Sequence, residues 1–145
     1  MPTAAEVVEA EVGDVDKLKG QKVYVPIYSS IHSWQKDRYV DLTAILSIRN
    51  ISPVDKIIIS KVDYYDTNGK FIRNYLSKPI VLSTLATKEF VIQEGDISGG
   101  TGANFIVQWD SDKNVAIPII ESVMVSTKHN QGISFISRGK EIEHH

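Results

Sequence analysis

The sequence predicts an all-β protein, and the arrangement that fits best is an immunoglobulin- or fibronectin-III-like sandwich of about seven or eight antiparallel strands. Three observations support this prediction. Apolar residues recur with a period of two, turn residues interrupt the chain about every ten residues, and helical periodicity is nearly absent. A small closed barrel is the alternative, because the same pattern of short strands would suit it.

The first two predicted strands show the alternation most clearly. Residues 22–28 place an apolar side chain at every second position from Val23 to Ile27. This strand contains Pro26, which has no N–H to donate, and we therefore expect it at the edge of a sheet. Residues 41–49 form a longer strand with one apolar and one mostly polar face.

The strongest turn signal is the pair Asn68-Gly69, which is typical of a primed turn with positive φ at both positions. It predicts a hairpin between strands at 57–66 and 71–75. Tyr64 and Tyr65 would point to opposite faces of the sheet, so only one of them can be in the core. The remaining predicted strands are residues 80–82, 89–93, 104–109, 119–127 and 132–137.

The chain of 145 residues fits a single domain. We assign residues 21–140 to the sandwich and residues 1–20 to a leader that is either flexible or a short helix. Residues 141–145 form a C-terminal tail, and His144-His145 resembles the remnant of an affinity tag. These two histidines are therefore not candidate metal ligands.

Composition excludes several classes of function. The net charge is −2 and the sixteen basic residues are scattered, whereas nucleic-acid binding needs a basic patch. No apolar run approaches the roughly 18 residues of a transmembrane helix. Because the chain has no cysteine, it can form neither a disulfide nor a thiolate metal site. An absence of cysteine suits an exported protein, and we favour an extracytoplasmic location (periplasmic, cell-surface or secreted).

A glycine-rich loop precedes the strand at 104–109. Gly99, Gly100 and Gly102 lie within four positions, and glycine is used where φ is positive or where another group approaches the backbone. The loop lacks the pattern of a phosphate-binding loop and leads into a strand instead of a helix. It is therefore either a tight corner or a ligand-contacting loop, with Asn104 as its most useful polar group.

Aromatic residues gather around the first strand and the loop that follows it, among them Tyr28, Trp34 and Tyr39, with His32 between them. Such residues either straddle core and surface or bind a saccharide or protein partner. Together with the glycine-rich loop they give the candidate ligand-binding residues, which are Tyr28, His32, Trp34, Gly99, Gly100, Gly102 and Asn104.

No catalytic residue, metal site or cofactor is predicted. Residues 110–114 with Glu121 imitate a calcium-binding loop, but Val115 occupies the position where such a loop needs glycine. His32 and His129 are the histidines outside the tail, and no serine lies in a Gly-x-Ser-x-Gly motif.

Several segments together resemble the family known as domain of unknown function 3124, which is found in bacteria and archaea. They span residues 23–29, 42–50, 62–66, 69–70, 98–105 and 131–135, and the resemblance covers about residues 20–139. It implies no activity, but members of that family often look exported or lipid-anchored.

We therefore expect a non-enzymatic binding or interaction module that uses loops at one end of the sandwich. A small hydrolase on the same scaffold is one alternative, and it would need a histidine close to a serine and a carboxylate. A structural or stress-protective domain is another, and it would have a smooth surface without a pocket.

Overall fold

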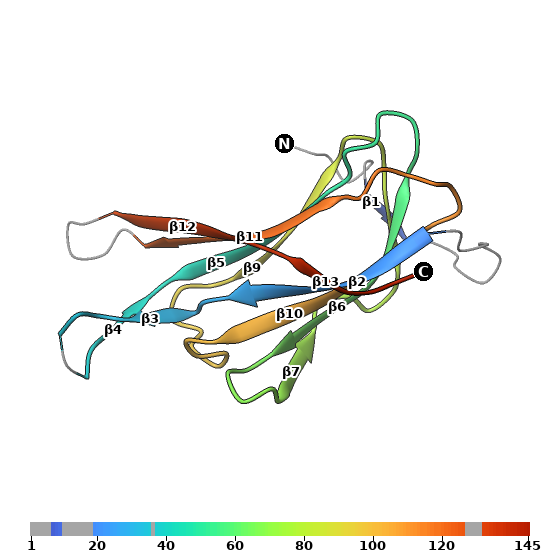
Figure 1. Ribbon diagram of the computed structural model, residues 1–145. Helices are drawn as coiled ribbons and strands as arrows, with labels where there is room; N and C mark the ends of the chain where they lie inside the picture. Colours follow the sequence, from blue (N-terminus) through green and yellow to red (C-terminus); the bar gives the residue numbers. More distant parts are fainter. Residues whose placement is uncertain (1–6, 10–18, 36, 127–131) are drawn as a thin grey trace.

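The computed structural model of the chain describes residues 7–9, 19–35, 37–126 and 132–145 (Figure 1). In this part of the chain every regular element is a strand, which confirms the all-β prediction. The strands are more numerous than the seven or eight predicted. They are β1 (Val7–Glu9), β2 (Lys19–Ile27), β3 (Ser30–His32), β4 (Tyr39–Asp41), β5 (Thr43–Arg49), β6 (Ile57–Tyr65), β7 (Phe71–Asn74), β8 (Ile80–Leu82), β9 (Thr87–Ile92), β10 (Ala103–Ser111), β11 (Ile119–Ser126), β12 (Ile133–Arg138) and β13 (Lys140–His144).

Most strands belong to two antiparallel sheets. The larger sheet has the order β1-β8-β6-β10-β2-β13, and β7 also pairs with β6. The smaller sheet has the order β12-β11-β5-β9, while β3 and β4 form a separate two-stranded hairpin. Across the described residues both sheets keep open edges, so the alternative prediction of a closed barrel is wrong.

One apolar core is built from both sheets. In strands such as β5 every second side chain points into this core, because successive side chains point to opposite faces. In β5 these are Ala44, Leu46 and Ile48, all with 0% exposure. Trp109 of β10 is also fully buried, and its indole N–H donates a hydrogen bond to Gln21 Oε1 at 3.0 Å, so its polar atom is satisfied.

The prediction that the first strand lies at an edge is wrong for most of β2, which runs between β10 and β13. However, β13 and the residue after it cover β2 only from Gly20 to Tyr24. Pro26 lies beyond this stretch, and its carbonyl accepts a hydrogen bond from the Ser122 hydroxyl at 2.6 Å. Because the N–H and C=O of one residue point to the same side of a strand, the missing donor of Pro26 removes no bond to β10.

The predicted hairpin is present as β6 and β7, but its turn differs from the prediction. Gly69 has a φ of 79°, whereas Asn68 does not have positive φ. The turn is stabilised instead by Asp66, whose Oδ1 accepts hydrogen bonds from the N–H groups of Asn68 and Lys70, each at 2.9 Å. Tyr64 is fully buried and Tyr65 only half-buried, so one tyrosine of the pair is in the core as predicted.

The described residues nearest each end of the chain pair with strands of the larger sheet. In the leader range, Val7–Glu9 form β1, which pairs with β8, and β2 begins at Lys19. Residues 141–145, which the sequence set apart as a tail, continue along β2, mostly within β13. His145 Nε2 lies 2.6 Å from Oδ1 of the buried Asp110.

The chain crosses from the smaller to the larger sheet at Gly139, between β12 and β13. The Gly139 N–H donates a hydrogen bond to the Ile120 carbonyl at 2.8 Å. A Cβ atom at this position would lie 2.7 Å from Val23 Cγ1, so the close approach of the two sheets requires glycine.

Candidate functional site

The β3–β4 hairpin projects from the same end of the molecule as the β11–β12 hairpin (Figure 1). Its tip is closed by two backbone hydrogen bonds, from Ser33 N–H to the Arg38 carbonyl at 2.8 Å and from Arg38 N–H to the Gln35 carbonyl at 3.2 Å. Its base is joined by a bond from Leu42 N–H to the Ser29 carbonyl at 2.9 Å. These hydrogen bonds fix the conformation of the hairpin, which carries its side chains outside the apolar core.

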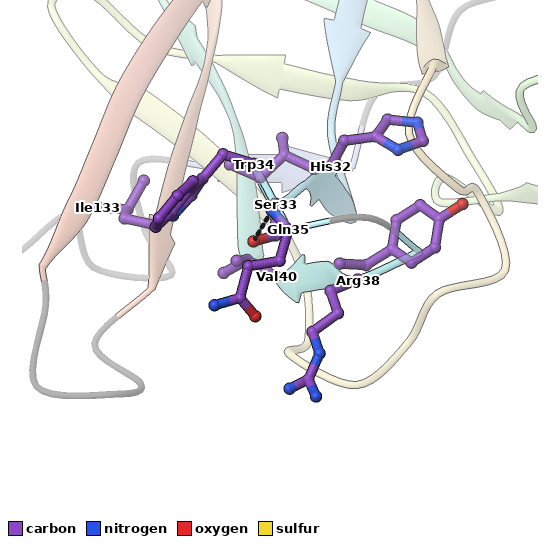
Figure 2. Close-up of a pocket in the computed structure, with 9 residues that line it drawn as sticks. His32, Ser33, Trp34, Gln35, Arg38, Val40 and Ile133 are labelled. Carbon is purple, nitrogen blue, oxygen red and sulfur yellow. Dashed lines mark hydrogen bonds between the residues drawn. The ribbon is translucent and has the colours of Figure 1, made fainter.

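A hollow of about 430 Å³ lies against this hairpin. Trp34 is 94% exposed, and Figure 2 shows its side chain beside Ile133 of β12, while Arg38 extends away from it. The His32 and Tyr39 rings lie 4.7 Å apart, tilted by 45°. The lining residues are Ile31, His32, Ser33, Trp34, Gln35, Arg38, Tyr39, Val40 and Ile133.

A second hollow of about 450 Å³ connects the hairpin to the glycine-rich loop. Tyr39, which is 57% exposed, lines both hollows. Ile97 of the glycine-rich loop is 58% exposed and lines the second one. The full lining is Ser30, Tyr39, Asp41, Thr67, Ile97, Gly100 and Thr101. The two hollows therefore form one surface, which we call the hairpin-end surface, defined by these two sets of lining residues.

The glycine-rich loop is braced against the β6–β7 turn. The N–H and the hydroxyl of Thr67 both donate to the Gly99 carbonyl at 2.9 Å, and the Thr67 Oγ1 accepts from Gly102 N–H at 3.0 Å. Gly100 has a φ of 80°, and its carbonyl accepts a hydrogen bond from Ser29 N–H at 3.2 Å. These contacts favour the tight-corner interpretation for most of the loop.

Tyr64 explains the glycine at position 99. A Cβ atom there would collide with the Tyr64 hydroxyl oxygen and would lie 2.8 Å from Ala103 Cβ. The Tyr64 hydroxyl is hydrogen-bonded to Ser29 Oγ at 2.8 Å in a buried position. Burial raises the pKa of Tyr64, so the phenol stays protonated.

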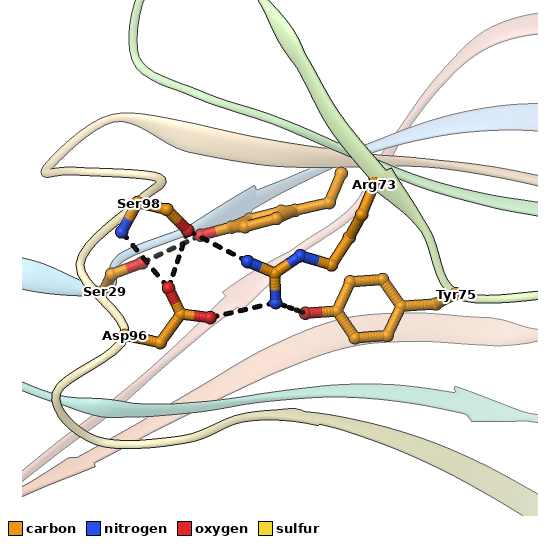
Figure 3. A network of polar contacts seen from close by, with 6 residues as sticks. Ser29, Arg73, Tyr75, Asp96 and Ser98 are labelled. Atoms are coloured by element: carbon orange, nitrogen blue, oxygen red, sulfur yellow. Dashed lines mark hydrogen bonds and ion pairs between the residues drawn. The ribbon is translucent and has the colours of Figure 1, made fainter.

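A polar cluster fixes the start of the same loop, and it was not predicted from the sequence (Figure 3). Arg73 donates hydrogen bonds to Asp96 Oδ2 at 2.9 Å, to the Tyr75 hydroxyl at 3.2 Å and to Ser98 Oγ at 3.1 Å. The Ser98 hydroxyl in turn donates to Asp96 Oδ1 at 2.6 Å. The guanidinium carbon also lies 5.8 Å from the ring centres of both Tyr64 and Tyr75. Arg73 is far from Asp96 in the sequence, so no local spacing could have indicated the pair.

The cluster shifts the pKa values of its members in consistent directions. The hydrogen bond from Ser98 and then the pairing with Arg73 lower the pKa of Asp96. The hydrogen bond to Asp96 raises the pKa of Arg73, and burial raises that of Tyr75. The ion pair is therefore held in its charged form beside two neutral phenols.

The structure brings together only some of the predicted site residues. His32, Trp34 and Gly100 belong to the hairpin-end surface. Tyr28 instead packs edge-on against Phe135, with ring centres 5.5 Å apart. Asn104 lies within β10 between Pro26 and Tyr65 and is 9% exposed. Gly99 and Gly102 brace the corner described above.

The residues considered as candidates for catalysis or metal binding are not brought together into a site in the described part of the chain. The His32 ring lies against the Tyr39 ring in a tilted arrangement, and within the described residues no hydrogen bond joins it to a serine or carboxylate. His129 falls outside the described residues. Asp110 is buried in β10, whereas Asn114 Oδ1 is near Lys19 Nζ at 3.3 Å. Across the parts of the chain that the structure covers, no three acidic or histidine side chains are grouped to hold a metal ion, and no helix could span a membrane.

Comparison with known proteins identifies the family. The family model described as "Protein of unknown function (DUF3124)" matches residues 20–142. The chain belongs to the DUF3124 family. This confirms the resemblance seen in the sequence, and the DUF3124 match includes the whole hairpin-end surface.

This DUF3124 chain is similar to the solved structure titled "Crystal Structure of Thermotoga maritima 1070", with a TM-score of 0.49 and 11% sequence identity. The similarity covers 83% of this chain and 92% of that chain. No curated protein matches the sequence.

Proposed function

We propose that this protein is a non-enzymatic binding module whose hairpin-end surface takes up a protein or saccharide partner. The observation that carries the proposal is Trp34, whose large apolar side chain is 94% exposed at the side of a hollow. A tryptophan held in water gains nothing for folding, whereas tryptophan and tyrosine dominate the energy of binding interfaces.

The surface has the mixed chemistry of a binding site. Volumes of about 430 and 450 Å³ fall within the range of small-ligand sites. Trp34 and Tyr39 offer aromatic faces, while Gln35 and Arg38 offer hydrogen-bond donors at the rim. An aromatic face with planar polar groups around it can stack on the C–H face of a sugar ring or on an apolar side chain of a protein.

The scaffold supports this role because the surface is anchored on both sides. Ser29 links the base of the hairpin to the core through Tyr64 and to the glycine-rich loop through the Gly100 carbonyl. Such anchoring reduces the entropy lost when a partner binds. A stress-protective domain without a binding role would need no such hollows, and the hydrolase alternative gains no support from His32.

We also interpret the two packed sheets as a variant of the immunoglobulin or fibronectin type III sandwich, in which loops at one end carry binding residues. We further propose that the module works outside the cytoplasm, in keeping with the absence of cysteine. Fractionation of cells that express the native gene tests the location, and recovery only in the cytoplasm would refute it.

The binding proposal is tested by a thermal-shift screen with oligosaccharides and peptides on the wild type and on Trp34→Ala. A ligand at about a hundred times its dissociation constant stabilises the fold by about 2.7 kcal/mol. For a domain of this size we expect a rise in Tm of about 8 °C. Trp34→Ala should lose most of this rise, whereas Val54→Ala, which removes a side chain 77% exposed outside both hollows, should keep it. An equal rise in wild type and Trp34→Ala would contradict the proposal.

A further inference from the structure

We propose that the open edge of β12 pairs with β12 of a second copy of this chain, antiparallel and about a two-fold axis. An edge strand presents unpaired N–H and C=O groups along one side, and proteins that stay monomeric protect such edges. The protecting features are short length, bulges, charged side chains and proline. The open strands of the described residues differ in these features.

The other edges are protected. Strands β3 and β4 have three residues each, and the part of β2 beyond Tyr24 contains Pro26. Strand β1 has three residues, and β7 has four, with a register shift against β6 and the charged Arg73. Strand β13 has a register shift between Glu141 and Glu143 and carries three charged side chains among its first four residues. At the far edge of the smaller sheet, β9 carries Lys88 and Glu89 in adjacent positions.

Strand β12 lacks these features. It has six residues without proline, and its register with β11 runs without a shift from Ile133 opposite Ser126 to Arg138 opposite Glu121. Its one charged residue, Arg138, lies at its end. Figure 1 shows β12 at the outside of the smaller sheet, with β11 as its neighbour. The six residues are Ile133, Ser134, Phe135, Ile136, Ser137 and Arg138.

Both faces of β12 suit a second copy. On its inner face Phe135 packs against Tyr28, so the strand is fixed in place before any partner arrives. On its outer face Ile136 is 59% exposed. A two-fold axis at Ile136 places this side chain opposite its own copy and Ser134 opposite Arg138, so no like charges oppose each other. The same strand thus supplies both halves of the contact, which is the requirement of a two-fold interface.

The contact extends the smaller sheet of one copy into that of the other through β12. Strand pairing alone is a small interface, so the dimer is expected to be weak and to depend on protein concentration. It does not use Trp34, but Ile133 of β12 also lines the first hollow, so the dimer is tested separately from the proposed binding function.

Sedimentation velocity over micromolar to millimolar concentrations tests the proposal. The wild type should move from the monomer mass of 16.2 kDa toward twice that mass as concentration rises. Ile136→Lys places two like charges opposite each other and should raise the dimer dissociation constant by about tenfold or more. The matched control is Val91→Lys on β9, a side chain 41% exposed at the other edge of the same sheet, and it should dimerise like the wild type.

A second pair of variants, with cysteine in place of lysine, tests the same contact even if the lysine variants are unstable. Because the chain has no cysteine, Ile136→Cys has a single thiol, and opposed residues of an antiparallel pair lie within disulfide distance. Oxidation should link Ile136→Cys into a covalent dimer and leave Val91→Cys monomeric. A wild type that stays monomeric throughout, an Ile136→Lys variant that dimerises unchanged, or loss of the dimer in Val91→Lys or Trp34→Ala would overturn the proposal. So would preferential cross-linking of Val91→Cys.

Discussion

Replacement of Gly99 by alanine tests the reason given for the glycine-rich corner. The new methyl group would collide with the Tyr64 hydroxyl and approach Tyr64 Cζ to 2.6 Å. The Tyr64 side chain cannot move away from the new methyl group, because other aromatic rings pack against it. Its ring centre lies 5.0 Å from that of Phe105 and 6.1 Å from that of Tyr75. Overpacking costs about 1–3 kcal/mol, and displacement of the phenol also breaks the bond to Ser29, which is worth about 1 kcal/mol. We therefore expect Gly99→Ala to lose about 3 kcal/mol of unfolding free energy.

Urea denaturation at equilibrium measures this loss, and the matched control is Gly102→Ala. A Cβ atom at Gly102 would lie 3.3 Å from Thr67 Cγ2 at an exposed site, where a small side-chain shift relieves the contact. Its expected loss is below about 1 kcal/mol. If Gly99→Ala is as stable as Gly102→Ala, the close packing of the loop on Tyr64 is not what requires glycine there.

The remaining predictions concern two buried or paired polar groups. Asn50 is 2% exposed; its amide donates to the carbonyls of Asp55, Leu82 and Ser83, and its Oδ1 accepts from Ser52 N–H. Asn50→Ala should therefore lose about 2–4 kcal/mol in the same urea assay, and a loss below about 1 kcal/mol would contradict this account. Asp96→Asn should lose about 1 kcal/mol at pH 7, after allowance for its 27% exposure. Because the pKa of Asp96 is lowered from 3.8 in the folded state, its stabilisation is present above that value and disappears as the pH falls through the folded pKa. The difference between Asp96→Asn and wild type should vanish in strong acid, and a constant difference at all pH values would refute the ion-pair explanation.

The sequence was sufficient for the features that depend on local pattern. Alternation in residues 41–49 predicted β5 because a half-buried strand needs nothing beyond its own period. The same reasoning gave the β6–β7 hairpin and the burial of one tyrosine in the pair Tyr64-Tyr65. Exposure of Trp34 could not be inferred, since tryptophan has an apolar body and a polar N–H and occurs both in cores and at surfaces.

Features that depend on contacts between distant segments were missed. Pro26 predicted an edge, but only the pairing of β13 with the first half of β2 shows which part of the strand is open. The Arg73–Asp96 pair joins β7 to the glycine-rich loop, and nothing in either segment points to the other. Likewise Tyr28 belongs to the aromatic group in the sequence but packs against Phe135 of β12 in the fold.

The most direct test of the binding proposal uses the indole N–H signals of the two tryptophans in ¹H–¹⁵N NMR spectra. Trp34 is 94% exposed on the hairpin-end surface, whereas Trp109 is fully buried and bonded to Gln21, so it serves as an internal reference. Titration with an oligosaccharide or peptide that stabilises the protein should move the Trp34 signal and leave the Trp109 signal in place. A ligand that binds while the Trp34 signal stays fixed and amide signals move elsewhere would contradict the assignment of function to this surface.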